Sequence, residues 1–309
     1  MPKLYAALAD LVALDPDPDA QPPRLPVLER LLSRAERRPA SPDWRRWALA
    51  CAGGEAPPGD LPLARALAVR HGLTPLASET WLLATPVHLV ASLSQLRLHH
   101  AGALTLAPGV ALRLAARHAA EWADPTLSLV AVGDSLLLRV DGLLAFESRD
   151  PDLWAGREVG AALPVGADAG RLRRLITELQ MWLHDAAPLA SNGLAINALW
   201  LWGGGHGPIA QPPAWPTLTS LDAGVAALAA DATRLPDAEL VSYRVADLAE
   251  RALDFADADV EWFAPLAARL AAGRLEDCRV HMGRHEFRLR AWQRWRVWVP
   301  SRPWWELAA

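Results

Sequence analysis

The most distinctive chemical feature of the chain is a run of four glycines and one histidine that follows a short apolar segment. Residues 198–202 read Ala-Leu-Trp-Leu-Trp, which predicts a buried strand, and residues 203–207 read Gly-Gly-Gly-His-Gly. Glycine permits a positive φ and a close approach of the backbone to a ligand. A glycine-rich turn beside a helix N-terminus can direct several N–H donors at an anion. We therefore predict a site for a small phosphorylated or carboxylated molecule at this loop.

The expected contacts at this site combine backbone and side-chain groups. They are Gly203, Gly204, Gly205 and His206 of the loop, with Asn197 and Trp202 at the two ends of the strand. The loop lacks the Lys-Ser/Thr pair of a P-loop and the Gly-x-Gly-x-x-Gly pattern of a dinucleotide site. The alternative is a tight turn in which only glycine fits against a neighbouring tryptophan.

Four histidines in the first half of the chain are candidates for holding a metal ion. His88 is expected within a strand, His99 and His100 end the next strand, and His118 lies in a predicted helix. Adjacent strand residues point to opposite faces, so only one of His99 and His100 would face His88 if the two strands pair. A metal ion would need a third ligand, such as His118 or an aspartate. We prefer hydrogen-bonded structural histidines and predict no metal site.

A later pair of histidines has the spacing of a zinc-binding helix. His281 and His285 are four residues apart, and Glu286 follows. Gly283 lies between them, and the residue types on either side alternate as they do in strands. The segment is therefore predicted to be a hairpin and not a metal-binding helix.

Tryptophans and arginines are interleaved between residues 290 and 305. Such a composition can bind single-stranded nucleic acid by stacking and charge. The spacing of Trp292, Trp295 and Trp298 instead predicts one helical face that closes over a core or a protein interface, and Trp304 and Trp305 follow.

Composition limits the remaining possibilities. The chain has 309 residues, of which 52% are hydrophobic, and a formal net charge of −4, which gives no overall electrostatic case for nucleic acid. Cys51 and Cys278 are far apart and form no metal-type spacing, which favours a reducing cytoplasm. We expect no signal peptide and no membrane segment, because neither a basic, apolar start nor a run of about 20 apolar residues is present. There is no Gly-x-Ser-x-Gly elbow either.

The elements that must position these residues indicate an α/β (α+β) protein. Residues 1–75 are expected to be a helical N-terminal region. Residues 76–165 have the order β-β-α-β-β, which suggests an α/β sandwich on an antiparallel sheet. From 166 to 309 strands and helices alternate, which favours a partly parallel, mixed sheet that carries the glycine loop.

Several of these segments resemble one known family. Residues 160–168 precede a helix over 172–185 that contains Glu-Leu-Gln-Met-Trp-Leu-His at 178–184, and the strand and glycines at 197–205 follow. This order resembles the RpfE-type regulatory proteins of proteobacteria, which are often labelled as related to cofactor-independent phosphoglycerate mutases. Residues 86–89 resemble that family's Asp-Pro-Val-His-Leu segment, with Thr85 at the acidic position. The resemblance covers most of residues 80–300.

The resemblance implies further ligand contacts. It suggests that Gln180 and His184, which share a helix face, line a pocket beneath the glycine strand together with Glu178. It also draws attention to His88. The true mutases belong to the alkaline-phosphatase-like group and use a Ser or Thr nucleophile on two metal ions held by Asp and His. Those motifs, and a late Asp-x-x-Gly-His cluster, are absent from the sequence.

These observations lead us to expect a cytoplasmic regulatory protein that binds a small anionic metabolite with little or no catalysis and no cofactor. One alternative is a metal-dependent phosphoglycerate mutase or phosphatase, with Mn or Zn held by the four early histidines. A second alternative is a protein-interaction module, or a homo-oligomer, that uses the tryptophan-rich C-terminal segment. No nucleic-acid or membrane partner is expected.

Overall fold

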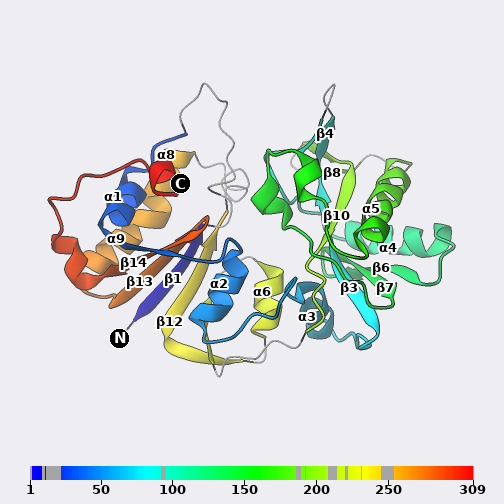
Figure 1. Cartoon of the computed structure of the whole chain (residues 1–309), viewed down its shortest axis with the longest axis horizontal. Helices are drawn as coiled ribbons and strands as arrows, with labels where there is room; N and C mark the ends of the chain where they lie inside the picture. Colours follow the sequence, from blue (N-terminus) through cyan, green and yellow to red (C-terminus); the bar gives the residue numbers. More distant parts are fainter. Residues whose placement is uncertain are drawn as a thin grey trace. The chain divides into compact units, whose positions relative to one another are not determined.

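The computed structural model describes residues 2–8, 11, 22–91, 95–185, 189–191, 193–207, 214–219, 222–230, 232–244 and 254–308. The chain forms two compact units (Figure 1). Unit 1 comprises Met1–Glu55, Ala210–Asp222 and Asp231–Ala309, and unit 2 comprises Ala56–Ile209 and Ala223–Ala230. These units are discontinuous in sequence and follow different boundaries from the three expected segments, 1–75, 76–165 and 166–309. The fold class is confirmed, because the protein is a mixed α/β structure with a mixed sheet.

Unit 1 is built on a six-stranded mixed sheet. Its order is β11 (Ala214–Leu218), β12 (Thr233–Tyr243), β1 (Lys3–Leu8), β13 (Asp277–Met282), β14 (His285–Arg290) and β2 (Glu36–Pro39). The pairs β11–β12, β12–β1 and β1–β13 are parallel, whereas β13–β14 and β14–β2 are antiparallel. The partly parallel sheet expected from the alternation of strands and helices is therefore present in this unit.

The N-terminal region is less helical than expected. It contains α1 (Pro26–Arg34), α2 (Trp44–Cys51) and α3 (Leu63–Arg70), but it also supplies β1 and β2. Strand β1 reads Lys-Leu-Tyr-Ala-Ala-Leu, a composition that favours a helix by local propensity. It is a strand because β12 and β13 bind both of its edges, which gives the continuous burial typical of a central parallel strand.

One face of the unit 1 sheet is packed by helices. Leu4, Val280 and Phe287 point toward Leu28 of α1 and Leu270 of α9 (Ala264–Ala271) in a single buried cluster. The chain reaches α9 through α8 (Phe255–Ala258) and the π-helical turn η4 (Asp259–Phe263), and after β14 it forms η5 (Ala291–Trp295) and α10 (Trp304–Ala308). Because strand residues alternate, the opposite face of the same strands carries charged and aromatic side chains and contacts α2.

Unit 2 contains a four-stranded antiparallel sheet in the order β10 (Ala198–Trp202), β3 (Glu79–Val87), β7 (Ser135–Asp141) and β6 (Leu127–Val132). Helices α4 (Val110–Glu121) and α5 (Ala169–His184) share its main core, and α3 packs with α6 (Ala223–Leu228) in a second cluster. Two small hairpins, β4 (Leu89–Ala91) with β5 (Leu96–Leu98) and β8 (Leu189–Ser191) with β9 (Leu194–Ile196), and the turns η2 (Pro151–Trp154) and η3 (Val159–Ala162) complete the unit. The expected order β-β-α-β-β on an antiparallel sheet is present in part. The second expected strand is β5, which pairs with β4 in a separate hairpin, and β10 supplies the fourth strand of the sheet.

Strand β10 departs from the expectation for residues 166–309. It was expected to belong to a partly parallel layer, but it forms an edge of the antiparallel sheet of unit 2. Its last residues pair with Thr85, Ala84 and Leu83 of β3. The glycine loop therefore does not lie at the carboxyl edge of parallel strands. No helix of the described residues has the length and apolar character needed to cross a bilayer.

Candidate functional site

The glycine loop is closely packed by its own unit. Gly203 has a φ of +68°, a backbone conformation that residues with a side chain rarely adopt. A Cβ on Gly204 would lie 2.7 Å from Leu82 and 2.8 Å from Phe146, and one on Gly205 would lie 1.8 Å from the carbonyl oxygen of Asp60. Glycine is therefore required at these positions by the protein's own packing.

The backbone of the loop is also hydrogen-bonded within the protein. The Gly203 N–H donates to Ser148 Oγ at 3.2 Å, and the Gly205 N–H donates to the Leu61 carbonyl at 3.3 Å. The Gly203 carbonyl accepts from the Ala64 N–H at 3.2 Å. Two of the N–H groups that could bind an anion are therefore already hydrogen-bonded within the protein. The loop has the geometry of a tight turn, which was the alternative to a ligand-binding loop.

Asp60 and Ser148 are neighbours of the loop that sequence analysis missed. The Asp60 carboxylate accepts from the Ser148 N–H at 3.0 and 3.1 Å and from the Ser148 hydroxyl. Asp60 lies in a segment rich in glycine and proline, and Ser148 is 88 residues away, so no local spacing connects them. Together they hold the turn after β10 in place, because Ser148 Oγ also receives the Gly203 N–H.

The side chains predicted to contact a ligand near the loop have partners within the protein. His206 is exposed, and its Nε2 donates to the Leu144 carbonyl at 3.1 Å and lies 3.4 Å from Thr80 Oγ1. The Trp202 indole N–H donates to Thr85 Oγ1 at 2.8 Å.

Asn197 and His88 bind other strands of unit 2. The Asn197 side chain accepts from the Leu89 N–H at 2.7 Å and donates to the Leu89 carbonyl at 2.8 Å, so it acts as a clamp between strands. His88 Nδ1 donates to the Ala195 carbonyl at 2.8 Å. These contacts are those of structural polar groups, and ligand binding at this place stays a prediction.

The early histidines are only partly brought together. The ring centroids of His88 and His99 are 5.5 Å apart, and those of His99 and His100 are 3.8 Å apart. Burial lowers the pKa of His99, and the neighbouring histidines lower it further. His118 is buried elsewhere, stacked on Trp122. Among the described residues, no group of three or more His, Cys, Asp or Glu side chains has the arrangement of a metal site.

Gln180 and His184 lie on α5 as expected, but at the margin of its packed face. That face meets β10 and the rest of the core through apolar side chains such as Leu175, Leu179 and Leu183. Gln180 is half-buried and His184 is exposed. No described contact joins either residue to the glycine loop.

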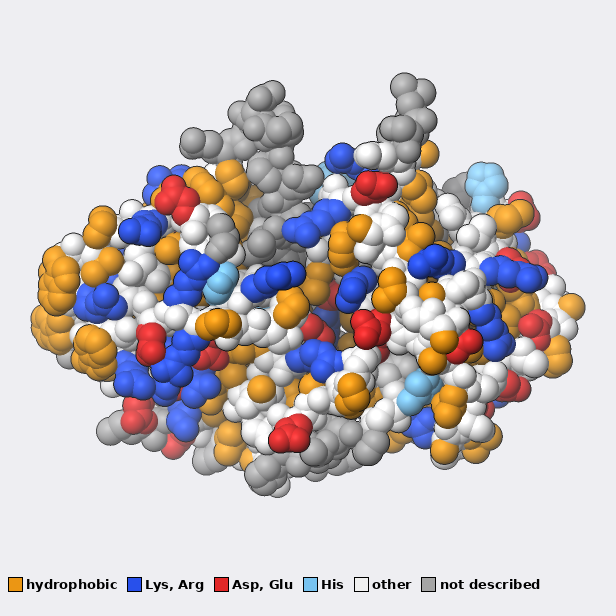
Figure 2. Space-filling view, in the orientation of Figure 1, with side chains coloured by type: hydrophobic (Ala, Val, Ile, Leu, Met, Phe, Trp, Pro, Cys, Tyr) orange, Lys and Arg blue, Asp and Glu red, His pale blue; other side chains and the backbone are white. Residues whose placement is uncertain are grey.

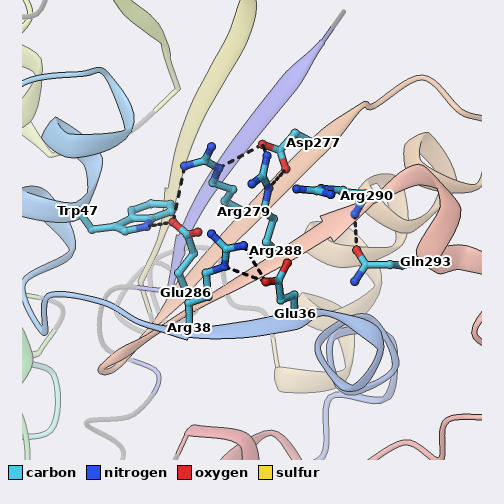
Figure 3. A network of polar contacts seen from close by, with 9 residues as sticks. All are labelled: Glu36, Arg38, Trp47, Asp277, Arg279, Glu286, Arg288, Arg290 and Gln293. Atoms are coloured by element: carbon cyan, nitrogen blue, oxygen red, sulfur yellow. Dashed lines mark hydrogen bonds and ion pairs between the residues drawn. The ribbon is translucent and has the colours of Figure 1, made fainter.

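Figure 3 shows the polar face of the unit 1 sheet, where the predicted hairpin of β13 and β14 is confirmed. Arg288 binds Asp277 through two hydrogen bonds of 2.7 and 2.9 Å, and Arg279 adds a third of 3.2 Å. The Trp47 indole N–H donates to Glu286 at 2.7 Å. The arginines and carboxylates of this face largely neutralise one another.

His281 and His285 serve the same sheet as structural residues. His281 is buried, and its Nε2 donates to the Ser41 carbonyl at 2.7 Å. His285 lies 2.7 Å from an Arg37 nitrogen. Burial raises the pKa of Cys51 and of Cys278 to about 12, so both thiols are protonated near neutral pH and are poor nucleophiles.

A pocket of about 400 Å³ opens in unit 1 between α1 and α9. Helix α1 lines it with Val27, Arg30, Leu31 and Arg34, which are spaced to share one helical face. Helix α9 contributes Ala264, Ala267, Leu270 and Ala271, and β14 and η5 contribute Leu289, Arg290 and Gln293. The pocket is therefore lined by apolar side chains together with three arginines, and no Asp or Glu is among its described lining residues.

The tryptophans after β14 correct a sequence-based expectation. Trp292, Trp295 and Trp298 were expected on a helical face that closes over a core or a protein interface. Their exposed fractions of 59%, 65% and 74% exclude the core, and the protein interface stays a prediction. The helical spacing is wrong because η5 ends at Trp295 and the chain turns away before Trp298. Trp304 does join the core, at 2% exposure, and donates to the Pro23 carbonyl.

Comparison with known proteins adds little. No family model matches the chain, and no curated protein matches it. The solved structures that resemble it include the PH0037 protein from Pyrococcus horikoshii, with a TM-score of 0.41, 12% identity and coverage of 93% of this chain and 86% of that one. They also include a cofactor-independent phosphoglycerate mutase from Thermoplasma acidophilum DSM 1728, with a TM-score of 0.30, 12% identity and coverage of 94% and 90%. These similarities are too weak to carry an argument about function, and the RpfE-type resemblance stays a prediction.

Proposed function

We propose that this protein binds a small anionic metabolite, phosphorylated or carboxylated, and acts in regulation by binding it without transforming it. The observation that carries the proposal is the pocket between α1 and α9. Its volume of about 400 Å³ lies in the usual range for small-molecule sites, roughly 300–1,000 Å³. Guanidinium groups are the side chains best suited to bind carboxylate and phosphate in a planar, two-pronged geometry.

The lining chemistry favours binding over catalysis. Arg30, Arg34, Arg290 and Gln293 are the polar residues among those described around the pocket. An arginine stays protonated, and an amide neither accepts nor releases a proton near neutral pH, so these groups offer no general base and no nucleophile. The apolar lining residues suit a ligand whose anionic group is attached to a carbon skeleton.

The charges around the pocket also favour an anion. The pKa of Glu36 lies below its ordinary value, chiefly because Arg38 donates to its carboxylate, and the charges of Arg290 and Arg288 contribute as well. Glu29 of α1 is turned to Arg24, which binds it through Nε at 2.8 Å. Glu29 and Glu36 are therefore each hydrogen-bonded to an arginine that does not line the pocket.

A thermal-shift panel tests this function with inorganic phosphate, 3-phosphoglycerate and its unphosphorylated acid, each with and without Mn²⁺. A ligand present at about 100 times its dissociation constant stabilises the folded state by about 2.7 kcal/mol. We expect a shift that does not need metal and that is lost in Arg30→Ala/Arg290→Ala. Arg174→Ala, at a 79% exposed arginine of unit 2, is the matched control and should keep the shift.

The same panel separates the two candidate locations. Loss of the shift in His206→Ala, with the pocket variant unaffected, would move the anion site to the glycine loop. A shift that requires Mn²⁺ would favour the metal-dependent enzyme, and a flat panel would contradict anion binding altogether.

A further inference from the structure

A second surface of unit 1 is not explained by metabolite binding. Between β14 and α10 the chain exposes four large hydrophobic side chains within seven residues. They are Trp292, Trp295, Val297 and Trp298, with exposed fractions of 59–74%. In Figure 2 hydrophobic side chains gather at the left edge of the view, over the segment drawn in orange-red in Figure 1, with basic side chains beside them. We call residues 290–302 the tryptophan segment.

The tryptophan segment is held in place at both ends. Gln293 is buried, accepts from the Arg290 N–H at 2.6 Å and donates to the Arg34 carbonyl at 3.2 Å. Arg296 donates to the same carbonyl at 2.9 Å, and the Arg302 N–H donates to Ser33 Oγ at 2.9 Å. The indole rings therefore project from an anchored backbone. Their exposure is a property of the fold.

The charge of this segment is opposite to that of the whole chain. Between Phe287 and Trp305 the sequence contains five arginines and neither Asp nor Glu, although the formal net charge of the chain is −4. Arg288 is bound by Asp277 on the sheet and Arg290 lines the pocket. The other three arginines, Arg294, Arg296 and Arg302, lie in the part of the tryptophan segment that follows. Salt screens electrostatic interactions beyond about 10 Å at ordinary ionic strength. A partner at this surface therefore interacts mainly with the nearby arginines and not with the net charge of the whole chain.

We propose that the tryptophan segment binds the surface of an anionic lipid bilayer. Tryptophan is suited to the boundary between lipid and water, because its ring is apolar and its N–H is polar. Arginines beside the rings are attracted to anionic headgroups. The absence of a membrane-crossing helix among the described residues is compatible with a protein that lies on the bilayer without spanning it.

The exposure of Val297 favours lipid over single-stranded nucleic acid. Both partners carry negative charge and can contact indole rings. A base gains its stacking energy from a flat ring, whereas an aliphatic side chain offers no such surface. Val297 is 69% exposed between two exposed tryptophans, which fits an apolar phase. The sequence predicts no membrane partner because it lacks a spanning segment, but attachment to a bilayer surface needs no such segment.

Vesicle flotation with the full chain tests the proposal. Vesicles of phosphatidylcholine with about 30% phosphatidylserine should carry the protein, and pure phosphatidylcholine vesicles should carry much less. Trp292→Ser/Trp298→Ser and Arg302→Gln should each lower the partition coefficient, the double tryptophan variant by about tenfold or more. Leu112→Ser/Met181→Ser removes side chains of 67% and 66% exposure from unit 2 and should have no effect.

Melting temperature and circular dichroism establish that each variant is folded. Equal binding to both kinds of vesicle, or unchanged binding of the tryptophan variant, would overturn the proposal. So would protein that ignores vesicles but binds an oligothymidylate through the same tryptophans, or that self-associates in sedimentation until they are replaced. None of these variants changes a residue that lines the metabolite pocket. A failure of lipid binding would therefore not count against the proposed metabolite binding.

Discussion

At the scale of single residues, the glycines after β10 are explained by packing. A Cβ on Gly205 would meet backbone atoms of Asp60 and Leu61, which cannot move aside as a flexible side chain could. We expect Gly205→Ala to lower the free energy of unfolding by about 2 kcal/mol or more. Gly170 of α5 has nothing within 4 Å of the Cβ position and no positive φ, so Gly170→Ala should raise stability by about 0.5–1 kcal/mol. Urea denaturation measures both, and equal effects would contradict the packing argument.

Sequence analysis located these glycines and could not determine what surrounds them. A Gly-Gly-Gly-His-Gly run indicates a backbone that has a positive φ or leaves no room for a Cβ. Gly203 has the positive φ, and Gly205 has no room for a Cβ. Whether a ligand or the protein itself occupies the space depends on Asp60 and Phe146, which are distant in sequence. The arginine pocket was missed for the same reason, because Arg30 and Arg290 come from opposite ends of the chain.

His281 provides a residue-scale prediction about pH. Burial lowers its pKa from 6.5 to about 4, while its hydrogen bond to Ser41 opposes the shift and His285 lowers it further. The unfolded chain therefore takes up this proton more readily than the folded one, so stability is lost as pH falls from about 6.5 toward 4. The loss attributable to this group is at most about 3 kcal/mol.

The matched variant is His281→Gln, which retains a donor for the Ser41 carbonyl. Unfolding free energies from urea titrations at several pH values should converge for the two proteins as pH falls through that window. Parallel curves for the wild type and the variant would show that His281 does not titrate as inferred.

At the scale of elements, α1 depends on a cap from a distant segment. Its first residues have no side-chain cap at Leu25, but the buried Asp259 carboxylate accepts from the Val27 N–H at 2.7 Å and the Leu28 N–H at 3.0 Å. We expect Asp259→Ala to lower stability by about 1–3 kcal/mol, because it leaves buried donors unsatisfied. Asp259→Asn keeps one acceptor oxygen and should recover part of the loss in thermal denaturation. An unaffected melting temperature in the alanine variant would contradict this role.

Element prediction succeeded where local signals agree with the tertiary structure. The hairpin expected around Gly283 is β13–β14, and the helix expected over 172–185 corresponds to α5. The alanine-rich strand β1 was missed, because its state is decided by strands more than 200 residues later. The sequence also predicts a helix over 245–253, but these residues lie outside those that the structure describes.

At the scale of the whole molecule, each unit has its own hydrophobic clusters. The cluster around Leu199 contains only residues of unit 2, and the cluster around Phe287 contains only residues of unit 1. Leu199→Ala should cost about 2–5 kcal/mol and Phe287→Ala about 3–5 kcal/mol. Hydrogen exchange followed by mass spectrometry should show faster exchange chiefly in the unit that carries the substitution. Equally accelerated exchange in both units would contradict separate cores.

The position of β1 has a consequence for synthesis on the ribosome. Its partners are β12 and β13, so the first strand to emerge has no neighbour until residues near 243 and 282 have been made. At about 5–20 residues per second, that delay is on the order of 10 to 50 seconds. Unit 2 is complete apart from α6 once residue 209 has emerged, and it can fold during this interval. A nascent chain would thus carry a finished second unit while its apolar first strand is still unpaired, which is the stage at which a chaperone would be most useful.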